Sequence, residues 1–140
     1  MKTYPVGREL KLLASRFESC ANRRLAPLGI TAAQAQILIT LDNSTDTLMP
    51  QKKLENAAGA SQACVAGIVA RLESKGLVTC KRDGEDRRIQ LVAITAQGSD
   101  LCKAAFEALK AAEKATFEKL SDDELALLNS LIARSVSVDE

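Results

Sequence analysis

Basic side chains gather in the centre of the sequence, where they could bind a polyanion. Residues 50–90 contain eight Lys and Arg against five Asp and Glu, a net charge of +3, whereas the remaining residues sum to −2. Four of the basic side chains flank a turn-forming Asp-Gly-Glu-Asp sequence: Lys81, Arg82, Arg87 and Arg88. Such a local excess of positive charge favours nucleic acid as a partner. A charged, solvated hairpin would carry the same residues, so charge alone leaves both interpretations open.

Catalytic and metal-binding side chains are sparse. The sequence contains no histidine, and its four cysteines lie far apart without a C-x-x-C pair: Cys20, Cys64, Cys80 and Cys102. The usual zinc-ligand spacings are therefore missing. The sequence also contains no G-x-S-x-G nucleophile motif, no P-loop and no G-x-G-x-x-G sequence. We expect no metal site, no cofactor and no enzymatic activity, with the cysteines as free thiols. A cysteine-dependent redox enzyme is the alternative that these residues leave open.

Length and composition fit one globular domain. The chain has 140 residues, of which 46% are hydrophobic and 26% are charged, and this excludes collagen-like, disordered and disulfide-scaffold classes. The longest apolar runs, such as residues 37–41, are far shorter than the roughly 18 to 20 residues needed to cross a bilayer. The first residues contain no apolar signal-peptide segment. We therefore expect a cytoplasmic protein with no membrane partner.

Helical periodicity predicts two helices before the basic centre. Apolar residues recur at helical spacing over residues 7–28, and Pro27-Leu28-Gly29 ends this first helix. Thr31 and Gln34 then form a capping box, because the hydroxyl and the amide can satisfy free backbone donors. This box predicts a second helix over about 32–41.

A helix-turn-helix pattern follows within the basic centre. Pro50 suits the first position of a third helix, which is expected to stop at Gly59. Ser61 suits the N-cap of a fourth helix that runs to about Lys75 and ends at Gly76. Four apolar residues form the predicted inner face of this fourth helix: Val65, Ile68, Val69 and Leu72.

After the fourth helix the apolar periodicity changes to two. Residues 77–82 and 87–94 are predicted as the strands of a β-hairpin around the turn at 83–86. Thr95 caps a long, alanine-rich helix that a neighbouring helix could approach closely, and Ser121-x-x-Glu124 opens a last helix. The fold is therefore mainly α with a small β-hairpin wing. In a winged module, the second helix of the pair enters the major groove and the hairpin tip reaches the backbone or minor groove.

The sequence around the wing resembles the MarR family of transcriptional regulators. The resemblance rests on Leu72-Glu73-Ser74-Lys75-Gly76-Leu77-Val78, on the D-x-R wing motif at Asp86-Arg87-Arg88, and on Ile94-Thr95-Ala96-Gln97-Gly98, which is similar to the family's L-T-x-x-G sequence. The similarity in architecture covers nearly the whole chain.

This resemblance implies a homodimer that binds a pseudopalindrome in double-stranded DNA. Residues 1–140 would form one domain, in which helices at about 7–28 and 96–137 hold the dimer and about 31–95 form the DNA-binding lobe. The two half-sites would lie roughly 34 Å, or one DNA turn, apart. The resemblance also implies a repressor, less often an activator, that a small ligand or an oxidant releases.

The predicted recognition helix offers few side chains for reading bases. Ser61 would cap the helix and offer a donor to a phosphate. Gln62 is the best candidate for base readout, because its amide can pair with adenine N6 and N7, while Ala63 and Cys64 could touch a thymine methyl. Three basic residues are expected to contact phosphates: Arg71, Lys81 and Arg82.

On the wing, Asp86 can pair with Arg88, which leaves Arg87 or Arg88 to enter a narrow minor groove. The alternative is that Asp86 and Arg88 form a purely structural bridge. Gly67 stands where many family members place a long basic or polar residue. Glu55 adds a negative charge near the DNA face. We therefore expect the wing and DNA shape to share the recognition.

Other functions stay open. The fold could serve as a protein-interaction module without DNA binding. A redox-sensing regulator would use Cys64, in the first turn of the recognition helix, or Cys20, although Cys20 falls on an apolar stripe that favours a packed structural thiol. The resemblance places a small-molecule effector between the dimer helices and the winged lobe, but the sequence identifies no pocket there. Core packing is expected for Phe17, Phe106 and Phe117.

Overall fold

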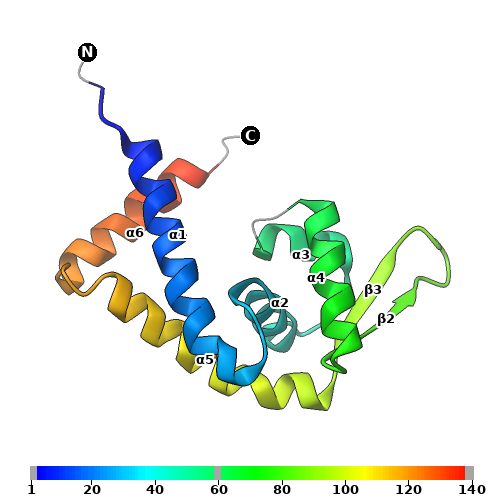
Figure 1. Ribbon diagram of the computed structural model, residues 1–140. Coiled ribbons are helices and arrows are strands. Elements are labelled where there is room, and N and C mark those ends of the chain that lie inside the picture. The colour runs from blue at the N-terminus through cyan, green and yellow to red at the C-terminus, as the bar shows by residue number, and fades with distance from the viewer. Residues whose placement is uncertain (1–2, 59–60, 138–140) are drawn as a thin grey trace.

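Six α-helices and a small three-stranded sheet form the part of the chain that the computed structural model describes, residues 3–58 and 61–137 (Figure 1). The elements are α1 Val6–Leu25, the 3₁₀ turn η1 Ala26–Leu28, α2 Ala32–Asn43, β1 Met49–Pro50, α3 Gln51–Ala58, α4 Gln62–Ser74, β2 Val78–Arg82, β3 Gln90–Ile94, α5 Ala96–Thr116 and α6 Asp122–Val136. The predicted mainly helical fold with a β-hairpin wing is confirmed. The terminal helix α6 and the wing lie at opposite ends of the molecule.

Helix α1 packs along α5, and small residues make the close approach possible. Ala21 of α1 is buried, as are Ala105 and Ala112 of α5. The corner between α1 and α2 is fixed by the Asn22 side-chain oxygen, which accepts a 2.7 Å hydrogen bond from the Ala32 N–H. The predicted capping boxes at the starts of α2 and α6 are both present.

The sheet differs from the predicted hairpin in two places. Its strand order is β1-β3-β2, and all pairs are antiparallel. Pro50 lies in β1, paired with Leu91, and not at the first position of α3. Its missing N–H is tolerated there because β1 is an edge strand. The expected stop at Gly59 lies outside the described residues.

The wing strands are also shorter than predicted. Strand β3 begins at Gln90, so Arg87, Arg88 and Ile89 belong to the turn. The Asp83 N–H donates to the Ile89 carbonyl at 2.9 Å, and the Ile89 N–H donates to the Asp86 carbonyl at 3.0 Å. These two bonds close the loop, which takes three residues out of the predicted strand.

A tight junction joins the winged lobe to α5. Gly76 ends the α4 segment with φ +77°, a conformation that L side chains rarely adopt. A Cβ atom at Gly98 would overlap the Leu77 carbonyl oxygen. The Thr95 hydroxyl donates to the Gly76 carbonyl at 2.8 Å and accepts from the Gly98 N–H at 3.0 Å. The start of α5 is therefore held directly against the end of α4.

The terminal helices carry apolar surface that the described residues of this chain do not cover. None of the described residues of α6 is buried, and Leu127, Leu131 and Val136 are 60%, 47% and 71% exposed. On α1, Val6, Leu10 and Leu12 are exposed as well. Phe106 of α5 is 50% exposed, so the core packing expected for this residue is wrong.

No single helix in the described ranges is both long and apolar enough to cross a membrane. One pair, Val6–Leu28 with Ala32–Asn43, meets the length and composition only when its two parts are taken together, and it bends by 73° at the break.

Candidate nucleic-acid interface

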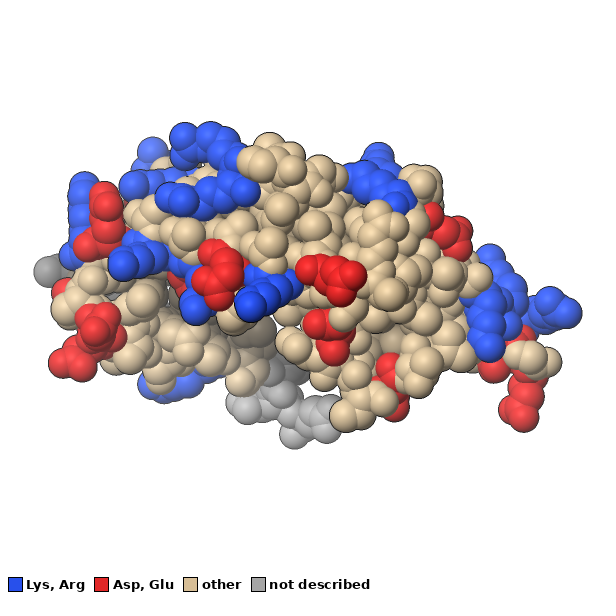
Figure 2. All heavy atoms as spheres, turned by 90° about the horizontal axis from the view of Figure 1, so that it is seen from below, with Lys and Arg blue, Asp and Glu red and all other residues tan. Residues whose placement is uncertain are grey.

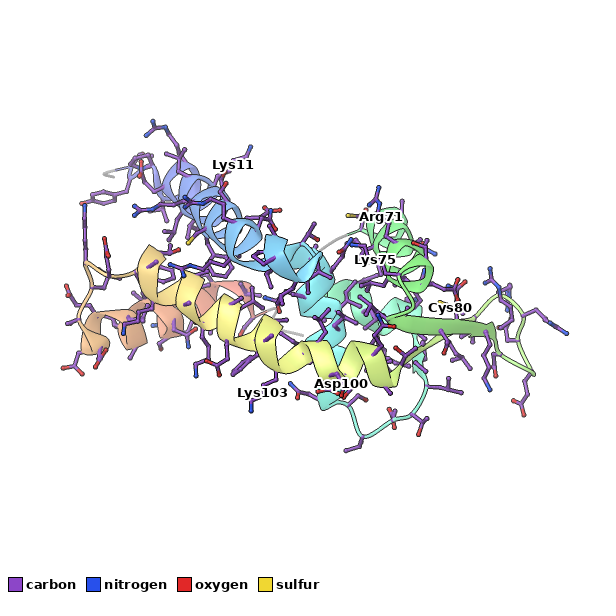
Figure 3. All side chains as sticks on the ribbon, turned by 60° about the horizontal axis from the view of Figure 1, so that its bottom comes forward. Lys11, Arg71, Lys75, Cys80, Asp100 and Lys103 are labelled. Carbon is purple, nitrogen blue, oxygen red and sulfur yellow. The ribbon has the colours of Figure 1, made fainter. Side chains whose placement is uncertain are left out.

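The exposed face of helix α4 carries mainly small side chains. The Ser61 hydroxyl accepts a 3.3 Å hydrogen bond from the Cys64 N–H, so the predicted N-cap is confirmed. The predicted inner face is buried, and the opposite side exposes Gln62, Ala63, Cys64, Ala66, Ala70 and Arg71. A Cβ atom at the half-buried Gly67 would meet nothing within 4 Å. Arg71 points away from the body of the molecule (Figure 3).

Lys75, at the C-terminal end of α4, is held by the α1–α2 corner. Its ammonium donates to the Gly29 carbonyl at 2.6 Å and to the Gln34 side-chain oxygen at 3.1 Å. The same Gln34 oxygen accepts from the Thr31 N–H, and Gln34 is buried. Lys75 therefore positions α4 against α2. This role was not predicted from the sequence, where Lys75 was only one of the basic residues, because its hydrogen-bond partners lie more than 40 residues away.

The wing is fixed by the predicted pair of Asp86 and Arg88. The Arg88 guanidinium donates to both Asp86 carboxylate oxygens at 3.1 Å, and the Arg88 N–H donates to the same carboxylate at 3.0 Å. These side-chain and backbone hydrogen bonds lower the pKa of Asp86 below its ordinary value. Among the described residues, Arg87 forms no ion pair, and it is exposed. The geometry thus distinguishes the two arginines, which the sequence could not.

A groove of about 730 Å³ runs between α3, α4 and the base of the wing. It brings together Gln62, Arg82 and Arg88 from the predicted set. It also contains residues that the sequence did not single out as site residues, among them Gln51, Lys52, Ala66, Ala70, Glu73, Ile89 and Gln90. The other predicted DNA contacts lie outside this groove: Ser61, Ala63, Cys64, Gly67, Arg71, Lys81 and Arg87. Only the fold could bring these distant segments together.

The groove mixes both signs of charge. Glu55 lines it, as expected from its place near the recognition helix, together with Glu73. The Glu73 carboxylate accepts a 2.9 Å hydrogen bond from the Cys80 N–H, which ties α4 to β2. Basic and acidic side chains also lie together at the end of the molecule where the wing projects (Figure 2).

All four cysteines are free thiols, and they differ in exposure. Cys64 is exposed, whereas Cys20 is half-buried and packs against the core. Burial, followed by the hydrogen bond and charge of Glu73, raises the pKa of Cys80 to about 11. Burial and the nearby Asp42 carboxylate raise the pKa of Cys102 to about 11. Across 3–58 and 61–137, no group of three metal-binding side chains comes together.

These environments predict selective alkylation. Treatment of the native protein with iodoacetamide at pH 8 is expected to modify Cys64 well before Cys80 or Cys102, because a thiol with a raised pKa holds little of the reactive thiolate at that pH. Peptide mass spectrometry after timed quenching would measure the order. In guanidinium chloride all four thiols are expected to react at similar rates. Equal native rates for Cys64 and Cys102 would contradict the structure.

Comparison with known proteins gives a consistent result. A profile described as "MarR family" matches residues 30–90. The uncharacterized HTH-type transcriptional regulator YdgJ of Bacillus subtilis is 28% identical over 124 residues, which are 89% of this chain and 70% of that protein. A mutant of MarR from E. coli complexed with operator DNA superposes with a TM-score of 0.83 at 25% identity, covering 95% of this chain and 94% of the other. BpsR of Bordetella bronchiseptica, whose DNA binding is regulated by 6-hydroxynicotinic acid, superposes with a TM-score of 0.87 at 24% identity, covering 96% and 100%.

Proposed function

We propose that this chain is a transcriptional regulator of the MarR family and not an enzyme, as its similarity to the family profile, to YdgJ and to MarR from E. coli supports. We propose further that it is a homodimeric repressor that binds a pseudopalindromic operator and is released by a small ligand. One observation carries the proposal. The exposed face of α4 stands beside a wing in which Asp86 holds Arg88 and leaves Arg87 without an ion pair among the described residues. This arrangement suits a major groove next to a minor groove. The structural relative bound to operator DNA supports it.

The exposed residues suggest a division of roles on the DNA. Ser61 and the N-terminus of α4 would meet a phosphate, and Gln62 would read a base. Arg87 would enter the minor groove, where negative potential is strongest when the groove is narrow. Three exposed basic residues would contact phosphates: Arg71, Lys81 and Arg82.

The uncovered apolar surface supports the dimer. A hollow of about 570 Å³ lies between α5 and α6, and apolar side chains line much of it, including Phe117, Leu125, Leu128 and Ile132. Soluble monomers rarely leave contiguous apolar surface of this kind open. A second copy would cover it with its own terminal helices. We therefore assign about 7–28 and 96–137 to dimerisation and about 31–95 to DNA binding, within one domain of residues 1–140.

Release by a small ligand is supported by a shallow hollow and by one relative. The hollow, about 390 Å³, joins the α1–α2 corner to the end of α4 and the start of α5, with Lys75 and Leu101 in its lining. A ligand there would touch both the proposed dimerisation helices and the DNA-binding lobe. The DNA binding of BpsR is regulated by 6-hydroxynicotinic acid.

The test is fluorescence anisotropy with a labelled duplex of roughly three helical turns, long enough for two half-sites. Four cations in each of two protomers, the three phosphate-contacting residues and Arg87 in the minor groove, predict a slope of about −7 in log affinity against log salt, since each neutralised phosphate contributes about −0.9. Tight binding at low salt with this steep slope is the expected result. Absence of binding at low salt would contradict the proposal and favour the protein-interaction alternative.

A further inference from the structure

The DNA-facing surface of α4 is poor in hydrogen-bonding groups. Between the N-cap and Arg71, Gln62 carries the one side-chain amide on the exposed face. Ala63, Ala66 and Ala70 end in methyl groups, and the open space beside Gly67 would admit a longer side chain that the sequence does not supply. Bases in the major groove are read by hydrogen bonds or by apolar contact with the thymine methyl. The exposed side chains of α4 therefore suit apolar contact with thymine methyl groups better than hydrogen bonding to base edges.

Recognition of guanine lacks its usual donor on this helix. The commonest specific contact to guanine is a bidentate bond from Arg or Lys. The basic residues of the α4 segment are Arg71 and Lys75, both near its C-terminal end, and the Lys75 ammonium is bonded to Gly29 and Gln34. The first two turns of α4 therefore offer no cation to a base edge.

Most other polar side chains in the groove are already paired within the protein. Arg88 is bonded to Asp86. The Gln90 amide donates to the Gln51 side-chain oxygen at 3.1 Å. The Glu73 carboxylate accepts from the Cys80 N–H. The remaining charged groups come from α3 and β2: Lys52, Glu55 and Arg82. Ile89, 39% exposed, adds apolar surface to the same groove as Ala66 and Ala70.

From these observations we propose that the half-site is rich in A·T pairs, read by apolar contact between alanine side chains of α4 and thymine methyl groups, with Gln62 bonding to adenine. The proposal rests on the proposed DNA binding and names the class of DNA that the surface fits. Methyl groups are the one feature of thymine in the major groove that needs no hydrogen-bonding partner. The surface therefore distinguishes thymine from the other bases by its methyl group.

The experiment uses wild-type protein and a duplex obtained by affinity selection from a random library. The selected duplex is then remade with deoxyuridine in place of thymine, which removes the methyl groups and leaves base pairing and phosphates unchanged. Each lost methyl contact is expected to weaken binding about fourfold, with an unchanged salt slope. The selected half-site is expected to be mainly A·T.

A variant tests the contact from the protein side. Ala70→Gly removes a methyl group from α4, so the loss on uracil substitution is expected to be smaller than for wild type. Ala57→Gly makes the same change at an exposed position of α3 that does not line the groove and is expected to keep the full loss. Equal binding of the thymine and uracil duplexes, or a G·C-rich selected site, would overturn the inference while leaving DNA binding intact. Failure to bind any duplex would overturn the proposed function as well.

Discussion

Substitution of Leu131 by glutamate is expected to split the proposed dimer and to weaken DNA binding by about 100- to 10,000-fold. Leu131 lies on α6 and is 47% exposed in the single chain, so its apolar surface is free to contact a second copy. A carboxylate buried in such an interface without a partner costs several kcal/mol. The affinity loss follows because a monomer binds one half-site without the gain from linked binding of the second.

The measurement pairs sedimentation analysis with anisotropy on the same samples. Ser130→Glu provides the matched control, since Ser130 is an exposed polar residue on the same helix, and this variant is expected to stay dimeric and to bind as wild type does. Because Leu131 is not buried within its own chain, both variants are expected to keep wild-type circular dichroism. A Leu131→Glu protein that remains a dimer would remove α6 from the interface.

The starts of α2 and α6 were predictable because their determinants are local. Thr31 and Gln34, like Ser121 and Glu124, lie three residues apart and satisfy each other's backbone donors. Strand β1 was not predictable in the same way. Its two residues form no alternating pattern, and it exists because Pro50 lies opposite Leu91, far along the chain.

In the candidate site too, contacts between residues near in sequence were predictable and contacts between distant residues were not. Asp86 and Arg88 are two residues apart, and their pairing was predicted from the sequence and is confirmed. The contacts that set the position of α4 and the groove join residues about 40 positions apart, as Lys75 joins Gly29 and Gln90 joins Gln51. No periodicity encodes such pairs. The residues on the exposed face of α4 were predicted from the sequence, but the groove that α3 and the wing form beside them was seen only in the structure.

The wing is expected to supply a large share of the affinity. Replacing both Arg87 and Arg88 by alanine is expected to weaken binding of a three-turn duplex by about 100-fold or more, because a dimer loses the charge-assisted hydrogen bonds of two Arg87 side chains, which contribute roughly 1.5 to 3 kcal/mol each. Lys103→Ala, at an exposed position of α5 far from the wing (Figure 3), is the control and is expected to bind as wild type does. Anisotropy at low and physiological salt would measure both affinity and salt slope.

The single variants separate the roles of the two arginines. Arg87 forms no ion pair among the described residues, so Arg87→Ala is expected to make the salt slope shallower by about 2, because the dimer loses two cations that neutralise the DNA from the minor groove. The Arg88 charge is already paired with Asp86, so Arg88→Ala is expected to lower affinity by loosening the wing, with little change in slope. Asp86→Ala is expected to resemble Arg88→Ala in affinity. The opposite pattern, with the slope change in Arg88→Ala, would mean that Arg88 leaves Asp86 on binding and that the pair seen here serves only the free protein.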